Sequence, residues 1–150
     1  MSVWVKPTTN TASDILGKWD TATPADQEFR LRTTAAGQVI FDFQTSTPTT
    51  SSISSIENLA VGVWSRITVA RSGTALYLYI NSKPQNVIDI GADPLIDTAL
   101  VPLSLGGNAM NSSSYFNGAI DDLVIYQSYL QERKIYFNYD KGLIGDPVIP

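Results

Sequence analysis

The sequence predicts an all-β protein built as a sandwich of antiparallel strands. Apolar residues recur with a period of two over short runs, which clusters of Gly, Pro, Asn, Ser and Thr separate. A helical pattern appears only near the C-terminal end, directly after an apolar run rich in β-branched and aromatic residues. Many short strands and one short helix in 150 residues favour a sandwich or a barrel.

Strands are expected where the alternation is clearest, and the helix is expected at residues 131–138. The predicted strands cover residues 2–6, 15–19, 28–33, 38–44, 52–57, 64–71, 75–81, 85–90, 103–105 and 119–126.

Glycine-containing turns connect several of these strands. Ala35-Ala36-Gly37 and Ser72-Gly73 predict hairpins, because glycine adopts positive φ without strain. Gly106-Gly107-Asn108 is a third turn signal. Residues 45–55 contain nine Ser or Thr among eleven, and we interpret them as a long surface loop that leads into an edge strand rather than as a linker between domains.

Length and composition restrict the function classes. A chain of 150 residues fits one domain. The absence of Cys and His removes the nucleophilic Ser-His-Asp and Cys-His groups and most zinc and iron sites. The net charge of −4 and the scattered basic residues argue against a nucleic-acid partner. No apolar run is long enough for a membrane span, so membrane insertion is not expected.

Two neighbouring predicted strands have one aliphatic face and one aromatic and polar face. Tyr77 and Tyr79 alternate with leucines, while Arg66 and Thr68 alternate with Ile67 and Val69. The two tyrosines either pair across strands on a solvated sheet, stack on sugars beside Arg66, or are buried against another subunit. We take Tyr77, Tyr79 and Arg66 as candidate ligand-binding residues.

Four segments together resemble the laminin-G-like jelly rolls of the concanavalin A-like lectin/glucanase superfamily. In order along the chain, they are SVWVKP, VWSRITVARSGTALYLYINSK, LSLGGN, and the turn and closing strand of FNGAIDDLVIYQSYLQERKI. The resemblance implies a two-sheet antiparallel jelly-roll sandwich at residues 1–141, with one short C-terminal helix, followed by an extended tail at residues 142–150.

The resemblance implies binding rather than catalysis. Retaining glycosidases of this fold place three carboxylates on one face of a strand, and Glu28, Glu57 and Glu132 lack that spacing. Asp42 is a single placed acid, so no enzyme activity is expected. The expected function is carbohydrate recognition or adhesion, with a glycan or protein surface as partner. The alternative is a structural virion protein, such as a phage capsid decoration or tail fibre subunit. Either would act extracellularly or on a virion surface, as a homo-oligomer or part of a larger assembly.

The resemblance also suggests a structural calcium ion. The first acid of the closing strand often ligates calcium in this superfamily, and Asp121 occupies that position. Alternatively, Asp121 or Asp122 accepts hydrogen bonds from backbone amides of the adjacent turn. Asn108 is a further candidate ligand-binding residue, and it lies in a loop that could line a second calcium site together with Asp20, Asp26, Asp93 and Asp97.

The chain departs from the family at its start. Related domains have one or two strands before the Trp-bearing strand, whereas Trp4 lies almost at the first residue. We therefore expect an open sheet edge, which the tail or a strand of a neighbouring subunit covers, unless the chain is a fragment.

Overall fold

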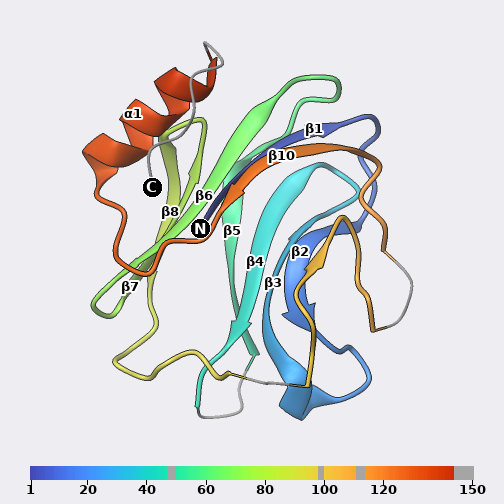
Figure 1. Cartoon of the computed structure of the whole chain (residues 1–150), viewed down its shortest axis with the longest axis vertical. Coiled ribbons are helices and arrows are strands. Elements are labelled where there is room, and N and C mark those ends of the chain that lie inside the picture. Colours follow the sequence, from blue (N-terminus) through green and yellow to red (C-terminus); the bar gives the residue numbers. More distant parts are fainter. Residues whose placement is uncertain (47–49, 98–99, 111–113, 144–150) are drawn as a thin grey trace.

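Two five-stranded antiparallel sheets pack face to face in the computed structural model, which describes residues 1–46, 50–97, 100–110 and 114–143 (Figure 1). The first sheet has the order β10-β1-β6-β7-β8, and the second has the order β5-β4-β3-β2-β9. Helix α1 lies against the outer face of the first sheet. The predicted all-β sandwich with one C-terminal helix is therefore confirmed.

The elements have the following bounds: β1 (Ser2–Pro7), β2 (Ser13–Trp19), the short 3-10 helix (Pro24–Asp26), β3 (Gln27–Thr33), β4 (Gln38–Gln44), β5 (Thr50–Asn58), β6 (Ser65–Ser72), β7 (Ala75–Ile80), β8 (Lys83–Asp89), β9 (Ser104–Leu105), β10 (Gly118–Val124) and α1 (Glu132–Leu143).

The core lies between the sheets, where each strand contributes every second side chain. Leu31 of β3, Phe41 of β4 and Leu78 of β7 are at most 3% exposed, while their sequence neighbours point outward. Burial of each such side chain contributes about 1.5–3 kcal/mol. The alternation that positions this core also leaves one outward face on each sheet, and these two faces are the surfaces that can carry a site.

The predicted turns form as expected at two hairpins. Gly37 connects β3 to β4 with φ of 87°, and Gly73 connects β6 to β7 with φ of 58°. The Ser/Thr-rich segment is more ordered than predicted, because β5 already begins at Thr50 and pairs with β4. Residues 47–49 of the predicted loop lie outside the described residues.

The helix is longer than predicted because its last turns pack on β1. Tyr139 stacks on Trp4 with ring centroids 5.6 Å apart, and Gly142 lies so close that a Cβ would be 2.6 Å from the Trp4 Nε1. The helix therefore ends at Leu143 rather than at residue 138. Residues 144–150 of the predicted tail lie outside the described residues. Within the described part of the chain, no helix is long and apolar enough to cross a membrane.

Candidate functional site

The predicted aromatic stripe on the first sheet is covered by α1. Tyr77 and Tyr79 do point outward and stack on each other, with centroids 6.4 Å apart. Tyr79, however, is only 4% exposed because Leu130 and Ile135 pack on it, and desolvation raises its pKa to about 12. Tyr77 is half-buried and packs near Tyr129. Of the alternatives for the two tyrosines, a solvated outer face is therefore wrong at Tyr79, which this chain's own helix segment covers.

Arg66 is buried beneath the same helix, at 2% exposure. Its Nε donates to Ser2 Oγ at 2.7 Å, its Nη1 donates to the Asn138 carbonyl at 3.0 Å, and its guanidinium lies 5.7 Å from the Trp4 ring centre. Desolvation lowers the pKa of Arg66. These contacts attach α1 to the sheet, so Arg66 is not accessible to a ligand in this structure.

The outer face of the second sheet carries a network of arginines and aspartates. Arg30 pairs directly with Asp42 across β3 and β4. Arg30 Nε donates to Asp42 Oδ2 at 2.9 Å, and Arg32 donates to both oxygens of Asp42 at 2.6 and 3.3 Å. The two arginine side chains are 20% and 28% exposed, whereas the Asp42 side chain is only 6% exposed. The network thus presents guanidinium groups toward solvent above a covered carboxylate.

Two residues of β2 make room for Arg30 and contact it. Gly17 pairs with Arg30, and a Cβ on Gly17 would lie 2.8 Å from the Arg30 Cβ. The Arg30 guanidinium makes a cation–π contact with Trp19, with Arg30 Cζ 4.7 Å from the ring centre. The orientation of Arg30 is therefore set by glycine and tryptophan together, as well as by Asp42.

Asp14 and Asn108 extend the network toward β9. The Asp14 carboxylate lies 3.8 Å from Arg30 Nη1 and is hydrogen-bonded to the Asn108 side chain. Burial raises the pKa of Asp14, and Arg30 and Asn108 partly offset this effect. Asn108 Oδ1 accepts from the Met110 amide at 3.0 Å, and Asn108 is 4% exposed. Asn108 thus lies at the site, where it holds other groups in place.

An exposed tyrosine borders a hollow beside this network. Tyr115 is 65% exposed, and its ring packs on Gly107, where a Cβ would lie 2.8 Å from the ring. The hollow has a volume of about 260 Å³ and is lined by Tyr115, Gly107, Asn108 and Ser104, among others. Gly107 and Asn108 also border the Asp14–Arg30 network, so the hollow and the network form one surface.

We call this surface the arginine–tyrosine face, comprising Asp14, Arg30, Arg32, Asp42, Asn108 and Tyr115. It offers guanidinium donors, carboxylate and amide groups, and an exposed aromatic ring. This combination can hydrogen-bond to hydroxyl groups and stack on an apolar ring face. Of the residues of this face, only Asn108 was predicted from the sequence to bind ligand, and Asp42 was considered only as a catalytic acid. The alternation of Arg30 and Arg32 around Leu31 was the sequence signal that could have identified this face.

Asp121 lies on β10, where its backbone pairs with Trp4. It is exposed, and its Oδ1 accepts a hydrogen bond from the Asp122 amide at 2.8 Å. Asp122 has φ of 46°, as expected for a local turn or bulge. No group of three or more His, Cys, Asp or Glu side chains suited to a metal occurs among the described residues. A calcium ion at Asp121 stays a prediction.

Comparison with known proteins identifies the fold family. Residues 1–136 match the model of a family described as the concanavalin A-like lectin/glucanases superfamily. No curated protein matches the sequence.

Solved structures of several binding domains share the fold. A proposed carbohydrate-binding protein from Bacteroides ovatus ATCC 8483 superposes with a TM-score of 0.73 at 12% identity, over 92% of this chain and 39% of that chain. The CBM40 of the Ruminococcus gnavus IT-sialidase, bound to α2,3-sialyllactose, superposes with a TM-score of 0.70 at 17% identity, over 91% of this chain and 79% of that chain. The binding domain of Paraclostridial Mosquitocidal Protein 1 superposes with a TM-score of 0.64 at 17% identity, over 94% of this chain and 36% of that chain. The chain thus spans less than two fifths of the first and third of these structures.

Proposed function

Because this chain belongs to the concanavalin A-like lectin/glucanases superfamily, we propose that it is a non-catalytic module that binds carbohydrate at an extracellular surface. The observation that carries the proposal is the arginine–tyrosine face, where partly exposed arginine side chains adjoin a hollow bordered by Tyr115. Two of the structurally similar proteins are described by their carbohydrate binding or their bound glycan, which supports the same ligand class.

The charges of the face favour sugar hydroxyls over acidic groups. Arg30 and Arg32 are both paired with Asp42, and Arg30 also lies near Asp14. The two positive and two negative side chains therefore balance formally. An acidic sugar would compete with Asp42 for the arginines, whereas a neutral sugar can use the remaining donors without breaking the pairs. We therefore propose a neutral glycan as the ligand.

The same geometry supports binding rather than hydrolysis. The side chains of Asp14 and Asp42 are each only 6% exposed. A catalytic acid or nucleophile must reach the glycosidic bond, and Asp42 is covered by the two arginines that it binds. A substrate could reach Asp42 only by displacing these arginines.

A glycan array tests the proposal. The native chain should bind a subset of neutral glycans, and Tyr115→Ala should weaken that binding about tenfold, equivalent to about 1.4 kcal/mol. Tyr136→Ala is the matched control, because Tyr136 is also an exposed tyrosine but lies on α1, against the other sheet. Equal binding by Tyr115→Ala and the native chain would contradict the proposed site.

Light scattering of the same samples tests the structural alternative. A symmetric assembly without any glycan signal would favour a structural subunit over a carbohydrate-binding module. A chain that binds glycans, whether alone or as an oligomer, supports the proposal.

A further inference from the structure

The hollow beside Tyr115 is small, and its lining indicates which part of a glycan it can hold. Its volume of about 260 Å³ lies below the roughly 300–1,000 Å³ of most small-molecule pockets. The hollow can therefore take one sugar residue or a substituent of that residue, and the rest of a glycan must lie outside it. The groups that line the hollow thus determine which sugar residue the arginine–tyrosine face accepts.

Backbone hydrogen bonds on both sides of Tyr115 fix the position of this residue. The Asp14 amide donates to the Ser114 carbonyl at 2.7 Å, directly before Tyr115 in the chain. Directly after it, the Phe116 amide donates to the Gly106 carbonyl at 3.0 Å. The wall of the hollow is therefore held in place before a ligand arrives, which reduces the cost of ordering it on binding.

Three exposed residues give the hollow an apolar lining. Leu105 and Ala109 supply aliphatic groups, and Tyr115 supplies an aromatic ring. Covering this surface with an apolar group is favourable, because water is removed from it. A methyl group on the sugar gains from these contacts, whereas a hydroxyl group at the same place does not.

One hydroxyl group in the lining can donate a hydrogen bond to a ligand. The Ser104 Oγ accepts a hydrogen bond from the Ala109 amide at 3.1 Å. A serine hydroxyl also has one hydrogen to donate, and within the described parts of the chain this hydrogen has no acceptor. Ser104 lines the hollow and is partly exposed. A carbonyl oxygen bound in the hollow can therefore accept from Ser104.

An acetamido group matches both features of the lining. Its methyl group covers the aliphatic groups of Leu105 and Ala109, and its carbonyl oxygen accepts from the Ser104 hydroxyl. We propose that the hollow selects a neutral sugar that carries an N-acetyl group, with the sugar ring stacked on Tyr115. This inference rests on the proposed carbohydrate binding at the arginine–tyrosine face, and it specifies the class of sugar.

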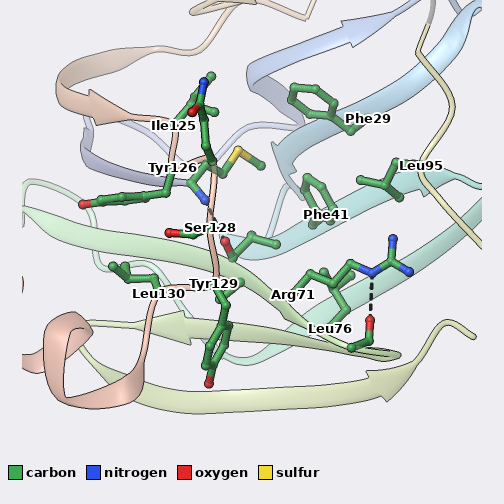
Figure 2. A pocket seen from close by; sticks show the side chains of 15 residues that line it. Phe29, Phe41, Arg71, Leu76, Leu95, Ile125, Tyr126, Ser128, Tyr129 and Leu130 are labelled. Atoms are coloured by element: carbon green, nitrogen blue, oxygen red, sulfur yellow. Dashed lines mark hydrogen bonds between the residues drawn. The ribbon is translucent and has the colours of Figure 1, made fainter. Parts of the chain in front are cut away.

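A larger cavity of about 420 Å³ is lined by residues of β6 and by the connector of residues 125–130 between β10 and α1 (Figure 2). Phe29, Phe41 and Leu76 give it an apolar lining, and none of its lining residues belongs to the arginine–tyrosine face. A sugar bound there would not contact Tyr115. The test therefore includes a variant that separates the two cavities.

Calorimetric titration with two matched pairs of ligands tests the inference. Chitotriose and cellotriose differ only in the acetamido or hydroxyl group at C2 of each ring, and so do the methyl glycosides of N-acetylgalactosamine and galactose. In the pair that binds more tightly, the acetamido member should bind at least about tenfold better, the effect of one methyl contact and one hydrogen bond.

Equal binding of both members of that pair, tighter binding of the hydroxyl member, or no binding of any of the four ligands would overturn the inference. The proposed function has a separate criterion, because it fails only if no neutral glycan binds on the array. Binding restricted to neutral glycans without an acetamido group would thus overturn the inference alone.

Two variants of the lining locate the acetamido group. Ala109→Leu adds a larger side chain to the hollow and should abolish the preference for the acetamido ligand, whereas Ala60→Leu, at an exposed position outside the hollow, should keep it. Ser104→Ala should also reduce the preference, and Ser104→Thr, which retains the hydroxyl group, should restore it. A preference that survives both Ala109→Leu and Ser104→Ala would overturn the inference.

Ser128→Trp separates the two cavities, because exposed Ser128 lines only the larger one. This variant should bind all four ligands as the native chain does, and a lost preference would place the acetamido group in the larger cavity and overturn the inference. Nuclear magnetic resonance gives an independent measurement. The Ala109 amide donates to the Ser104 hydroxyl, so its resonance should shift with the acetamido ligand and not with the hydroxyl ligand.

Discussion

Arg66 Nη1 donates to the backbone carbonyl of Asn138 at 3.0 Å, and this contact joins β6 to α1 across 72 residues of sequence. The bond helps to keep the outer face of the first sheet closed at Tyr79, since the helix cannot leave without breaking it. Arg66 Nη2 and Asn138 Oδ1 are both buried without a partner among the described residues. The helix is thus held by a network that is only partly satisfied.

Replacing Arg66 should loosen α1. Arg66→Leu places an apolar side chain at the position, leaves the Asn138 carbonyl without the Arg66 donor, and leaves Ser2 Oγ with only its hydrogen bond to the Thr68 hydroxyl. We expect the free energy of unfolding to fall by about 1–3 kcal/mol, the cost of an unsatisfied buried polar group. Urea denaturation measures this change. Arg133→Leu, at an exposed position of α1, is the control and should have little effect; an equal loss in both variants would contradict the role of Arg66.

Asp42 should be more important for stability than the exposed acid Glu57. Asp42→Asn removes the charge that Arg30 and Arg32 share, and we expect a loss of about 2–3 kcal/mol because the carboxylate is buried. Glu57→Gln disrupts an ion pair with Lys83 in which both side chains are largely exposed. That change should lower stability much less, because solvent screens an exposed ion pair. Thermal and urea unfolding of both variants provide the comparison, and similar losses would contradict the buried network.

The stability of the protein should depend on pH through Asp14. Burial raises the folded-state pKa of Asp14 above its ordinary value of 3.8. At a pH between 3.8 and the raised folded-state pKa, the folded state therefore binds more protons than the unfolded state. The contribution of Asp14 to stability therefore falls as the pH rises through this window, and it stays low above it. Asp14→Asn removes this dependence.

Urea unfolding of the native chain and of Asp14→Asn from acid to neutral pH measures the effect. All other titrating groups are common to both proteins, so the difference between the two curves reports on Asp14. The native chain should lose stability relative to the variant as the pH rises. A constant difference, or one of opposite sign, would show that the Asp14 pKa is not raised.

The sheets could be predicted from the sequence because their signals are local. Alternation of apolar residues and turns such as Gly37 and Gly73 determine strands and hairpins without distant contacts. The cover over Tyr79 could not be predicted, since it depends on Leu130 and Ile135 packing on it from outside the sheet. Ser82 shows the same limit. It has φ of 65°, and its hydroxyl donates to the Ile135 carbonyl at 3.3 Å, a contact with α1 that no local pattern predicts.

The arginine–tyrosine face was partly accessible to sequence reasoning. The hairpin at Gly37 gives the register that places Arg30 opposite Asp42, so the ion pair follows from the turn. The position of Tyr115 does not follow in this way. It lies beside Asp14 through an isolated bridge that connects segments about a hundred residues apart, and such contacts have no local signal.

Gly17 offers a final test that links packing to binding. A Cβ at this position would lie 2.7 Å from the Phe29 carbonyl and 2.8 Å from the Arg30 Cβ, so Gly17→Ala must move backbone atoms of β3. We expect a loss of about 1–3 kcal/mol from this crowding. Because Arg30 then shifts relative to Trp19 and Asp42, glycan binding should weaken as well.

Gly62→Ala makes the same exchange at a glycine with nothing within 4 Å and φ of 75°. It should cost about 1 kcal/mol through backbone strain alone, and it should leave glycan binding unchanged, because Gly62 is not part of the arginine–tyrosine face. Calorimetry of unfolding and glycan titration of both variants separate the two effects. If Gly17→Ala lowers stability but binds glycan as the native chain does, then the orientation of Arg30 does not control binding, and Tyr115 with its hollow is the part of the face that holds the ligand.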